Sequence, residues 1–96
     1  MYASIRRYTG VDPRLFVELE RHRRSLETAL GAVPGFRGHY TVRHDEGLTT
    51  VTLCEDRAGA DASVRVAASW ARENIPDMIS GPPEVSNGEV ALQIGG

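Results

Sequence analysis

Residues 36–55, FRGHYTVRHDEGLTTVTLCE, contain two stretches in which apolar and polar side chains alternate on either side of a short turn sequence. Strict alternation is typical of a strand with one buried face, so Phe36–His44 and Leu48–Glu55 are predicted strands. The residues between them, 45–47, have the sequence DEG, a short glycine-containing connection typical of hairpins. The stretch therefore predicts an antiparallel hairpin, around which the rest of the chain can be placed.

The register of this hairpin follows from matching apolar with apolar positions. Placing Val42 opposite Val51 and Tyr40 opposite Leu53 collects the apolar side chains on one face and the threonines on the other. A shift by one residue would mix the two faces. We therefore expect one apolar face, packed against helices, and one polar face.

Four further elements flank the hairpin. A strand is expected over Tyr2–Tyr8, and a helix over Pro13–Leu30, started by Asp12 and Pro13. Asp56 is expected to cap an alanine-rich helix that ends near Asn74 or Ile75, before Pro76. Val90, Leu92 and Ile94 alternate in a last strand over Glu84–Ile94. The order βαββαβ predicts an α+β, ferredoxin-like fold over residues 1–96: a four-stranded antiparallel sheet with two helices on one face.

The two faces of this sheet receive different predicted roles. The side chains expected to face the helices are Ala3, Ile5, Phe36, Tyr40, Val42, Val51, Leu53, Val90, Leu92 and Ile94. The opposite face is either exposed to solvent, as antiparallel sheets tolerate, or stacked on a second copy in a two-fold homodimer. The residues expected at that homodimer interface are Tyr2, Arg6, His39, Thr41, Thr52 and Cys54.

Composition narrows the class of protein. A domain of 96 residues buries only about two thirds of its surface alone, which favours a partner copy. All 11 basic residues are arginine, which excludes mechanisms that need a lysine amine, and the net charge of −2 offers no basic stripe for nucleic acid or membrane. The single cysteine excludes an internal disulfide, and the chain has neither a signal core nor an apolar membrane span. We expect a cytoplasmic protein without a metal site.

The candidates for catalysis are His22, Tyr40 and Arg7. His22 falls inside the apolar stripe of the first predicted helix, where it is either a core histidine bonded to Tyr40 or the base of a pocket between helices and sheet. Arg7 stands at the end of the first strand, where it either extends to solvent or binds an anion at the pocket mouth. His39 and Cys54 lie opposite each other, but nothing in a strand lowers the pKa of a thiol, so we interpret them as packing.

Other side chains are candidates for the pocket wall. Trp70 and Asn74 lie on the flank of the alanine-rich helix, where Trp70 either packs in the core or stacks on a planar ligand, with Asn74 as a polar contact. Phe36 is a further candidate for the lining. An enzymatic function is excluded if the space between helices and sheet is filled by Phe16, Phe36, Tyr40 and Trp70. An open cavity is compatible with an enzyme.

The assembled pattern resembles the dimeric α/β-barrel superfamily, and within it the small proteins similar to antibiotic biosynthesis monooxygenases. The stretches that carry the resemblance are YASIRRY (2–8), VPGFRGHY (33–40), EDRAGADAS (55–63), WARENI (70–75) and GPPEV (81–85). The last two resemble a branch without assigned activity. The resemblance implies a homodimer whose sheets face each other, with a cavity in each subunit between sheet and helices.

The resemblance also implies two alternative functions. Some relatives oxygenate aromatic or quinol compounds without metal or flavin; His22, Tyr40, Arg7, Trp70 and Asn74 could then supply the base, the anion stabiliser and the walls of the pocket. Others degrade haem with an asparagine on the first strand, which this strand lacks, so haem degradation is disfavoured. The alternative to an enzyme is a noncatalytic homodimer that holds a small hydrophobic or aromatic ligand.

Overall fold

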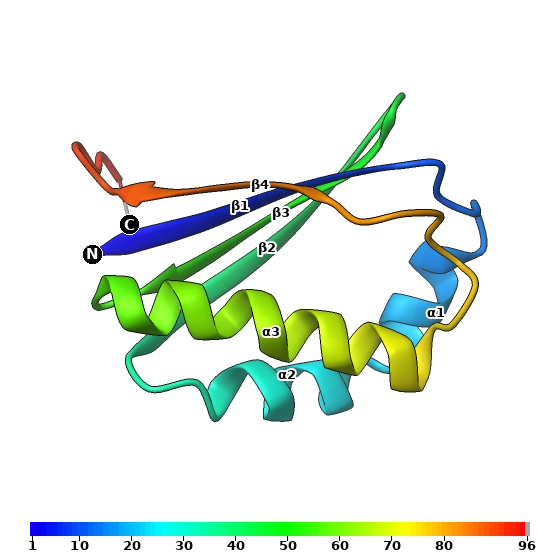
Figure 1. Ribbon diagram of the computed structural model, residues 1–96, viewed down its shortest axis with the longest axis horizontal. Coiled ribbons are helices and arrows are strands. Elements are labelled where there is room, and N and C mark those ends of the chain that lie inside the picture. Colours follow the sequence, from blue (N-terminus) through cyan, green and yellow to red (C-terminus); the bar gives the residue numbers. More distant parts are fainter. Residues whose placement is uncertain (96) are drawn as a thin grey trace.

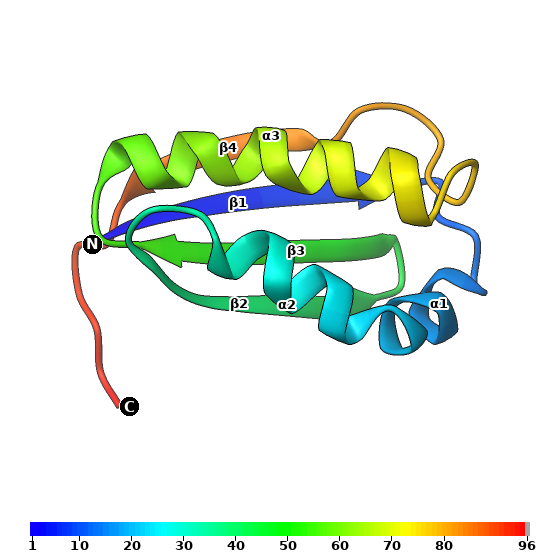
Figure 2. The ribbon, with the colours of Figure 1, turned by 90° about the horizontal axis from the view of Figure 1, so that it is seen from below.

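The computed structural model describes residues 1–95 and confirms the ferredoxin-like α+β fold (Figure 1). Its elements in chain order are β1 (Tyr2–Thr9), α1 (Leu15–Arg21), α2 (Arg23–Gly31), β2 (Phe36–His44), β3 (Gly47–Cys54), α3 (Arg57–Asn74) and β4 (Glu84–Glu89). The strands form one antiparallel sheet in the order β2-β3-β1-β4. The helices lie on one side of this sheet (Figure 2). There α2 lies over β2 and β3, and α3 lies next to α2, on the side of β1 and β4.

The predicted first helix is two helices. A break falls at His22, whose backbone angles, φ −100° and ψ 15°, leave the helical range. α1 and α2 therefore meet at an angle instead of forming one rod over Pro13–Leu30. The second predicted helix is confirmed: Asp56 caps α3 by accepting a hydrogen bond from the Gly59 backbone N–H at 2.9 Å, and α3 ends at Asn74.

The register of the hairpin differs from the predicted one by two residues. Tyr40 lies opposite Val51 instead of Leu53, because β3 begins at Gly47, which pairs with His44 and leaves a two-residue turn. Gly47 has φ 142°, a conformation that favours glycine. A shift by an even number keeps the same residues on the same face. A bulge between Phe36 and Gly38 brings Phe36 opposite Cys54.

The sequence predicted that the apolar face of the sheet packs against the helices and that the polar face lies outside. For most of the sheet this prediction is wrong. The polar face lies beneath the helices, where Ser4, Arg6, Thr52 and Cys54 are completely or almost completely buried. Burial of this polar face is tolerated because its threonine hydroxyls and the Arg6 guanidinium bond one another. Arg6, Thr52 and Cys54 were expected at a dimer interface, but they lie inside the subunit. Tyr2, His39 and Thr41 belong to the same helix-facing side.

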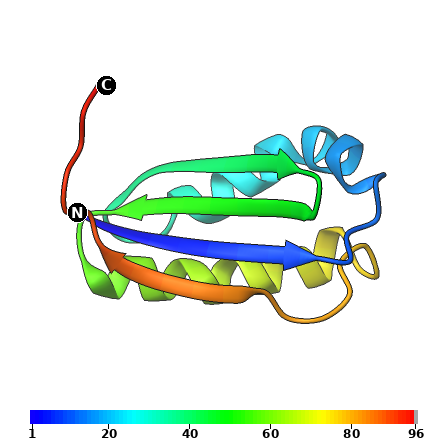
Figure 3. The same ribbon diagram turned by 90° about the horizontal axis from the view of Figure 1, so that it is seen from above.

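The apolar face points away from the helices. Ile5, Tyr40 and Val42 are 40%, 60% and 50% exposed there, although they were expected against the helices. Strand registers place them with Val51 on one surface, seen from above in Figure 3. The packed core lies instead between the helices and the sheet, where α1 and the C-terminal end of α3 meet the start of β3. Its buried members are Leu15, Leu48, Trp70 and Ile75. The fold therefore buries a polar sheet face and exposes an apolar one.

The last strand is shorter than predicted. β4 ends at Glu89, which pairs with Tyr2, the first residue of β1. One further hydrogen bond follows, from the Val90 N–H to the Met1 carbonyl oxygen at 2.8 Å. The alternation that reaches Ile94 therefore continues outside the sheet, and Leu92 and Ile94 are exposed.

Candidate functional site

An open cleft lies between the α1–α2 pair and the edge of the sheet formed by β2 and β3. It has an inner recess of about 50 Å³ and an outer chamber of about 700 Å³. The two adjoin, because both are lined by Leu19, Leu26, Leu30, His39 and Thr41. The recess continues to Arg6, Tyr8 and Trp70, and the chamber continues to Phe16 and Phe36. The space between helices and sheet is therefore open, with apolar walls.

Arg6 on β1 forms the floor of the recess and is only 1% exposed. Its Nε donates to Thr50 Oγ1 at 2.9 Å, and its Nη2 donates to Thr52 Oγ1 at 2.8 Å. Its Nη1 donates to the Ser63 carbonyl oxygen on α3 at 3.1 Å. All three acceptors are neutral. Burial lowers the pKa of Arg6, and the neighbouring Tyr8 and Cys54 oppose this shift.

His39 on β2 stands where the recess meets the chamber. Its Nδ1 lies 2.8 Å from Thr52 Oγ1, and its Nε2 lies 3.2 Å from Thr41 Oγ1. Burial, and secondarily the charge of Arg6, lowers its pKa to about 4. The imidazole is therefore neutral near pH 7. Because Thr41 is exposed, Nε2 is the nitrogen that a ligand in the chamber can reach.

Two aromatic side chains complete the recess. The Trp70 indole N–H on α3 donates to Ser25 Oγ on α2 at 3.0 Å and ties the two helices together. Tyr8 lies on β1 two residues from Arg6, and burial raises the pKa of its hydroxyl. These rings give the recess flat apolar surfaces next to the Arg6 guanidinium.

The structure separates the residues that the sequence grouped into one pocket. Trp70 lines the recess and Phe36 lines the chamber. Asn74 does not line either; its amide donates to the Trp70 carbonyl at 2.9 Å. His22 stands at the break between α1 and α2, 3.5 Å from a Glu18 carboxylate oxygen, with its ring edge-on to Trp70 at 6.4 Å. It lies outside the lining of the cleft, and Ile5 and Tyr40, its expected neighbours, are on the other side of the sheet.

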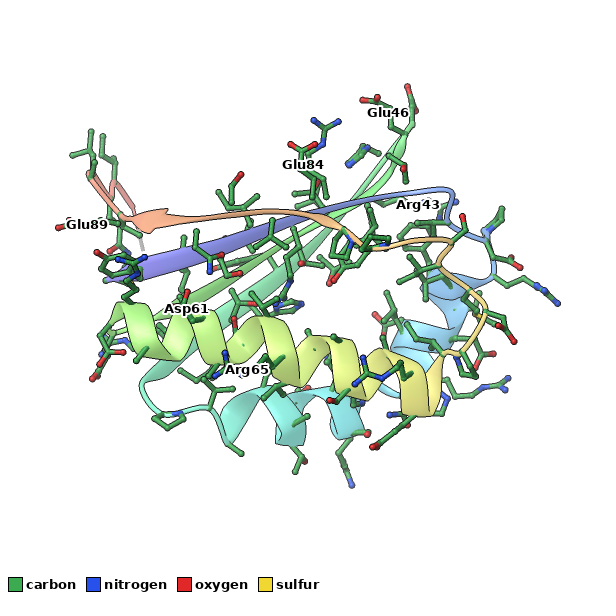
Figure 4. The ribbon with its side chains drawn as sticks, in the orientation of Figure 1. Arg43, Glu46, Asp61, Arg65, Glu84 and Glu89 are labelled. Atoms are coloured by element: carbon green, nitrogen blue, oxygen red, sulfur yellow. The ribbon has the colours of Figure 1, made fainter. Side chains whose placement is uncertain are left out.

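Arg7 and Tyr40 lie on the outer face. Arg7 forms an exposed ion pair with Glu46 at 3.5 Å, away from the cleft. Figure 4 shows Glu46 and Glu84 on the side of the sheet opposite α3, which agrees with the pairing of Arg7 with Glu84 between β1 and β4. His39 pairs with Thr52, not with Cys54, so the predicted juxtaposition of thiol and imidazole does not form. Burial raises the pKa of the Cys54 thiol.

Sequence reasoning missed Arg6 and His39 as members of a ligand site. Both were placed correctly on one face with Thr50 and Thr52, but that face was assigned to the dimer interface. The available signal was the combination of a cation, an imidazole and threonines on one strand face. A buried guanidinium needs hydrogen-bond acceptors, which hydroxyl and imidazole groups can supply, whereas an arginine exposed on the surface can bond to water instead.

Comparison with solved structures identifies the class of fold. A candidate antibiotic biosynthesis monooxygenase of Bordetella bronchiseptica superposes with a TM-score of 0.72 at 18% identity, over 95% of this chain and 97% of that one. The haem degrader MhuD of Mycobacterium tuberculosis, with two haems in its active site, gives 0.69 at 23% identity over 99% and 100%. A Streptomyces coelicolor monooxygenase in complex with nanaomycin D gives 0.66 at 14% identity over 99% and 90%.

The chain therefore has the fold of the antibiotic biosynthesis monooxygenase-like proteins, as the sequence resemblance implied. No protein-family model and no curated protein sequence matches it. Among residues 1–95, no cluster of three His, Cys, Asp or Glu side chains is placed to hold a metal ion. None of the helices in that range is long and apolar enough to cross a membrane.

Proposed function

We propose that the cleft binds a small aromatic compound and that the protein is a cofactor-independent monooxygenase of the antibiotic-biosynthesis type. The observation that carries the proposal is the open cleft, with apolar and aromatic walls and a floor made by Arg6 and His39. A pocket of this kind, mostly apolar with a few convergent polar groups, is typical of small-molecule sites. The structural relatives that bind haem or nanaomycin D have the same fold.

The proposed chemistry takes its electrons from the substrate. An enolisable ring system such as an anthrone loses a proton, and the resulting enolate reduces O₂. The ring CH₂ becomes C=O, one oxygen atom enters the product, and the other leaves as water, so no external reductant is needed. In this proposal Arg6 stabilises the enolate oxygen, which lowers the pKa of the substrate. The enolate in turn offsets the charge of Arg6 that lowers the pKa of His39, so that His39 Nε2 can accept the proton.

Haem, which some proteins of this fold bind, does not fit the residues of this cleft. Iron bound to His39 would place a second cation near the buried guanidinium of Arg6, whose charge already acts on this imidazole. The two cations would repel each other. We therefore propose that the ligand is an organic compound other than haem.

We further propose that the protein is a homodimer whose subunits meet through the outer sheet face. The isolated subunit leaves Ile5, Tyr40 and Val42 exposed on one side of the sheet, next to the half-buried Val51 and Leu53. A contiguous apolar surface on a small domain is typical of an interaction surface. A second copy would cover this surface by a two-fold axis. The interface thus proposed is the face that the sequence assigned to the helices.

Oxygen consumption with anthrone and hydroquinone substrates tests the enzymatic proposal. Wild-type protein is expected to consume O₂, and His39→Ala to lower kcat by about 100-fold, a usual loss for a proton-transfer group. His22→Ala serves as the matched control, because His22 lies outside the cleft; its rate should stay within about twofold of wild type, well below any effect worth 1.4 kcal/mol. If aromatic ligands bind and no oxygen is consumed, the noncatalytic ligand-binding alternative replaces the enzyme. Equal losses in both variants would contradict the role of His39.

A further inference from the structure

We infer that the ligand of this cleft is an aromatic oxyanion, best matched by a carboxylate, and that its charged group binds Arg6 at the inner end. The inference rests on the proposed function in one respect, namely that the cleft holds an aromatic compound. It adds the charge and the orientation of that compound.

Arg6 differs from the paired arginines of the chain. The arginines with a carboxylate oxygen within 4 Å are Arg7, Arg14, Arg21, Arg23, Arg37 and Arg57. All six are on the surface, where an ion pair contributes little. Arg6 is the most buried cation, yet residues 1–95 place no carboxylate within 4 Å of it.

The hydrogen bonds of Arg6 leave room for one more partner. A guanidinium has five N–H donors, and three of them bond to Thr50, Thr52 and the Ser63 carbonyl. One N–H on Nη1 and one on Nη2 have no acceptor among the described residues. Neutral acceptors reduce the cost of burying the cation but do not neutralise its charge. An oxyanion would supply both the missing charge and the missing acceptors.

The shape of the cleft fixes which end of the ligand lies inside. The recess beside Arg6, at about 50 Å³, holds a few water molecules or a group of that size, and not a ring system. The chamber, at about 700 Å³, has room for rings against Phe16 and Phe36. The recess has Arg6 and no acidic residue in its lining, whereas the chamber has Glu20 and the ion pair of Arg23 with Glu27. An anionic head group therefore enters the recess, and the aromatic body stays in the chamber.

The inference is tested by a pair of ligands that differ only in charge. Binding of 2-naphthoate and of its neutral isostere 2-naphthamide is measured by calorimetry near pH 7. The NMR signal of the indole N–H of Trp70, the only tryptophan, reports binding in the recess. We expect 2-naphthoate to bind at least tenfold more tightly than 2-naphthamide, and both to shift the Trp70 signal.

Two charge-removing variants locate the source of this preference. Arg6→Gln should bring the two affinities within about twofold of each other, well under the 1.4 kcal/mol of a tenfold difference. Arg7→Gln removes the same charge from the outer face and should keep the preference. The wild-type comparison needs no variant, so it stands even if Arg6→Gln fails to fold.

The outcomes distinguish this inference from the proposed function. Equal affinity of the wild type for both ligands overturns the oxyanion inference and leaves an aromatic site. A preference that Arg7→Gln removes as fully as Arg6→Gln does also overturns it, because a general field of the protein would then be the cause. If neither ligand binds, the aromatic site itself is contradicted, and the inference fails with it.

Discussion

The two faces of the sheet differ in polarity and in exposure. The face beneath the helices has Arg6, Thr50 and Thr52, all buried, while the opposite face has Ile5 and Tyr40, both exposed. Hydrophobic burial acting within one subunit would favour the reverse arrangement. This reversed arrangement supports both proposals, a ligand site against the polar face and a second subunit against the apolar face.

The two faces also differ in how the isolated subunit compensates them energetically. The polar face is partly compensated within the subunit, because Arg6 bonds both threonines, although the buried Ser4 hydroxyl has no hydrogen-bond partner among the described residues. The outer face has no such internal compensation, and its apolar side chains gain only when water is excluded. Mutations on the two faces should therefore change different measurable quantities.

The largest expected change in stability comes from removing the buried aromatic ring of Trp70, and it should exceed the change from removing the exposed ring of Tyr40 on the outer sheet face. Trp70→Ala should lower the free energy of unfolding by about 3–5 kcal/mol at any protein concentration, because it empties a buried site. Tyr40→Ala should abolish the increase of Tm with protein concentration and leave the Tm of the monomer unchanged, because that increase comes from association of subunits. Thermal unfolding at several concentrations measures both. A concentration-independent loss in Tyr40→Ala as large as that in Trp70→Ala would contradict the comparison.

A charge on the outer face should have the next largest effect. Val42→Glu places carboxylates near a two-fold interface and is expected to raise the dimer dissociation constant at least 100-fold, with each subunit still folded. Light scattering should then change from twice 10.5 kDa to 10.5 kDa at micromolar concentration. Val17→Glu on α1, which is exposed away from the sheet, is the matched control. A monomeric wild type would refute the homodimer.

A smaller effect is expected from acidification of the polar face. The pKa of His39 is about 4 in the folded protein, against an ordinary value of 6.5, so between these values the unfolded chain binds a proton that the folded chain does not. Stability should therefore fall as the pH drops from 6.5 to 4, by about 2 kcal/mol for a residue that is only partly buried. Urea unfolding across this range measures it, and His39→Gln should lose this component. An equal slope in the variant would assign the pH dependence to other groups.

Several elements were predictable because short-range chemistry determines them. Asp56 caps α3 because a carboxylate three residues before a free backbone N–H can accept its hydrogen bond. The alternation in residues 36–55 predicted both strands of the hairpin and placed Thr50 and Thr52 on one face, and the alternation in residues 2–8 placed Arg6 on that same face. The order of elements then restricted the topology to the observed sheet.

The sequence by itself thus determined the elements, their order and the sets of side chains that share a face. Only the tertiary structure decided which face the helices cover, because alternation has the same period whichever side is buried. It also decided the break at His22 and the end of β4 at Glu89, which pairs with Tyr2. The polar face could be buried because Arg6, His39 and the threonines satisfy one another, and this network forms only when β1, β2, β3 and α3 meet.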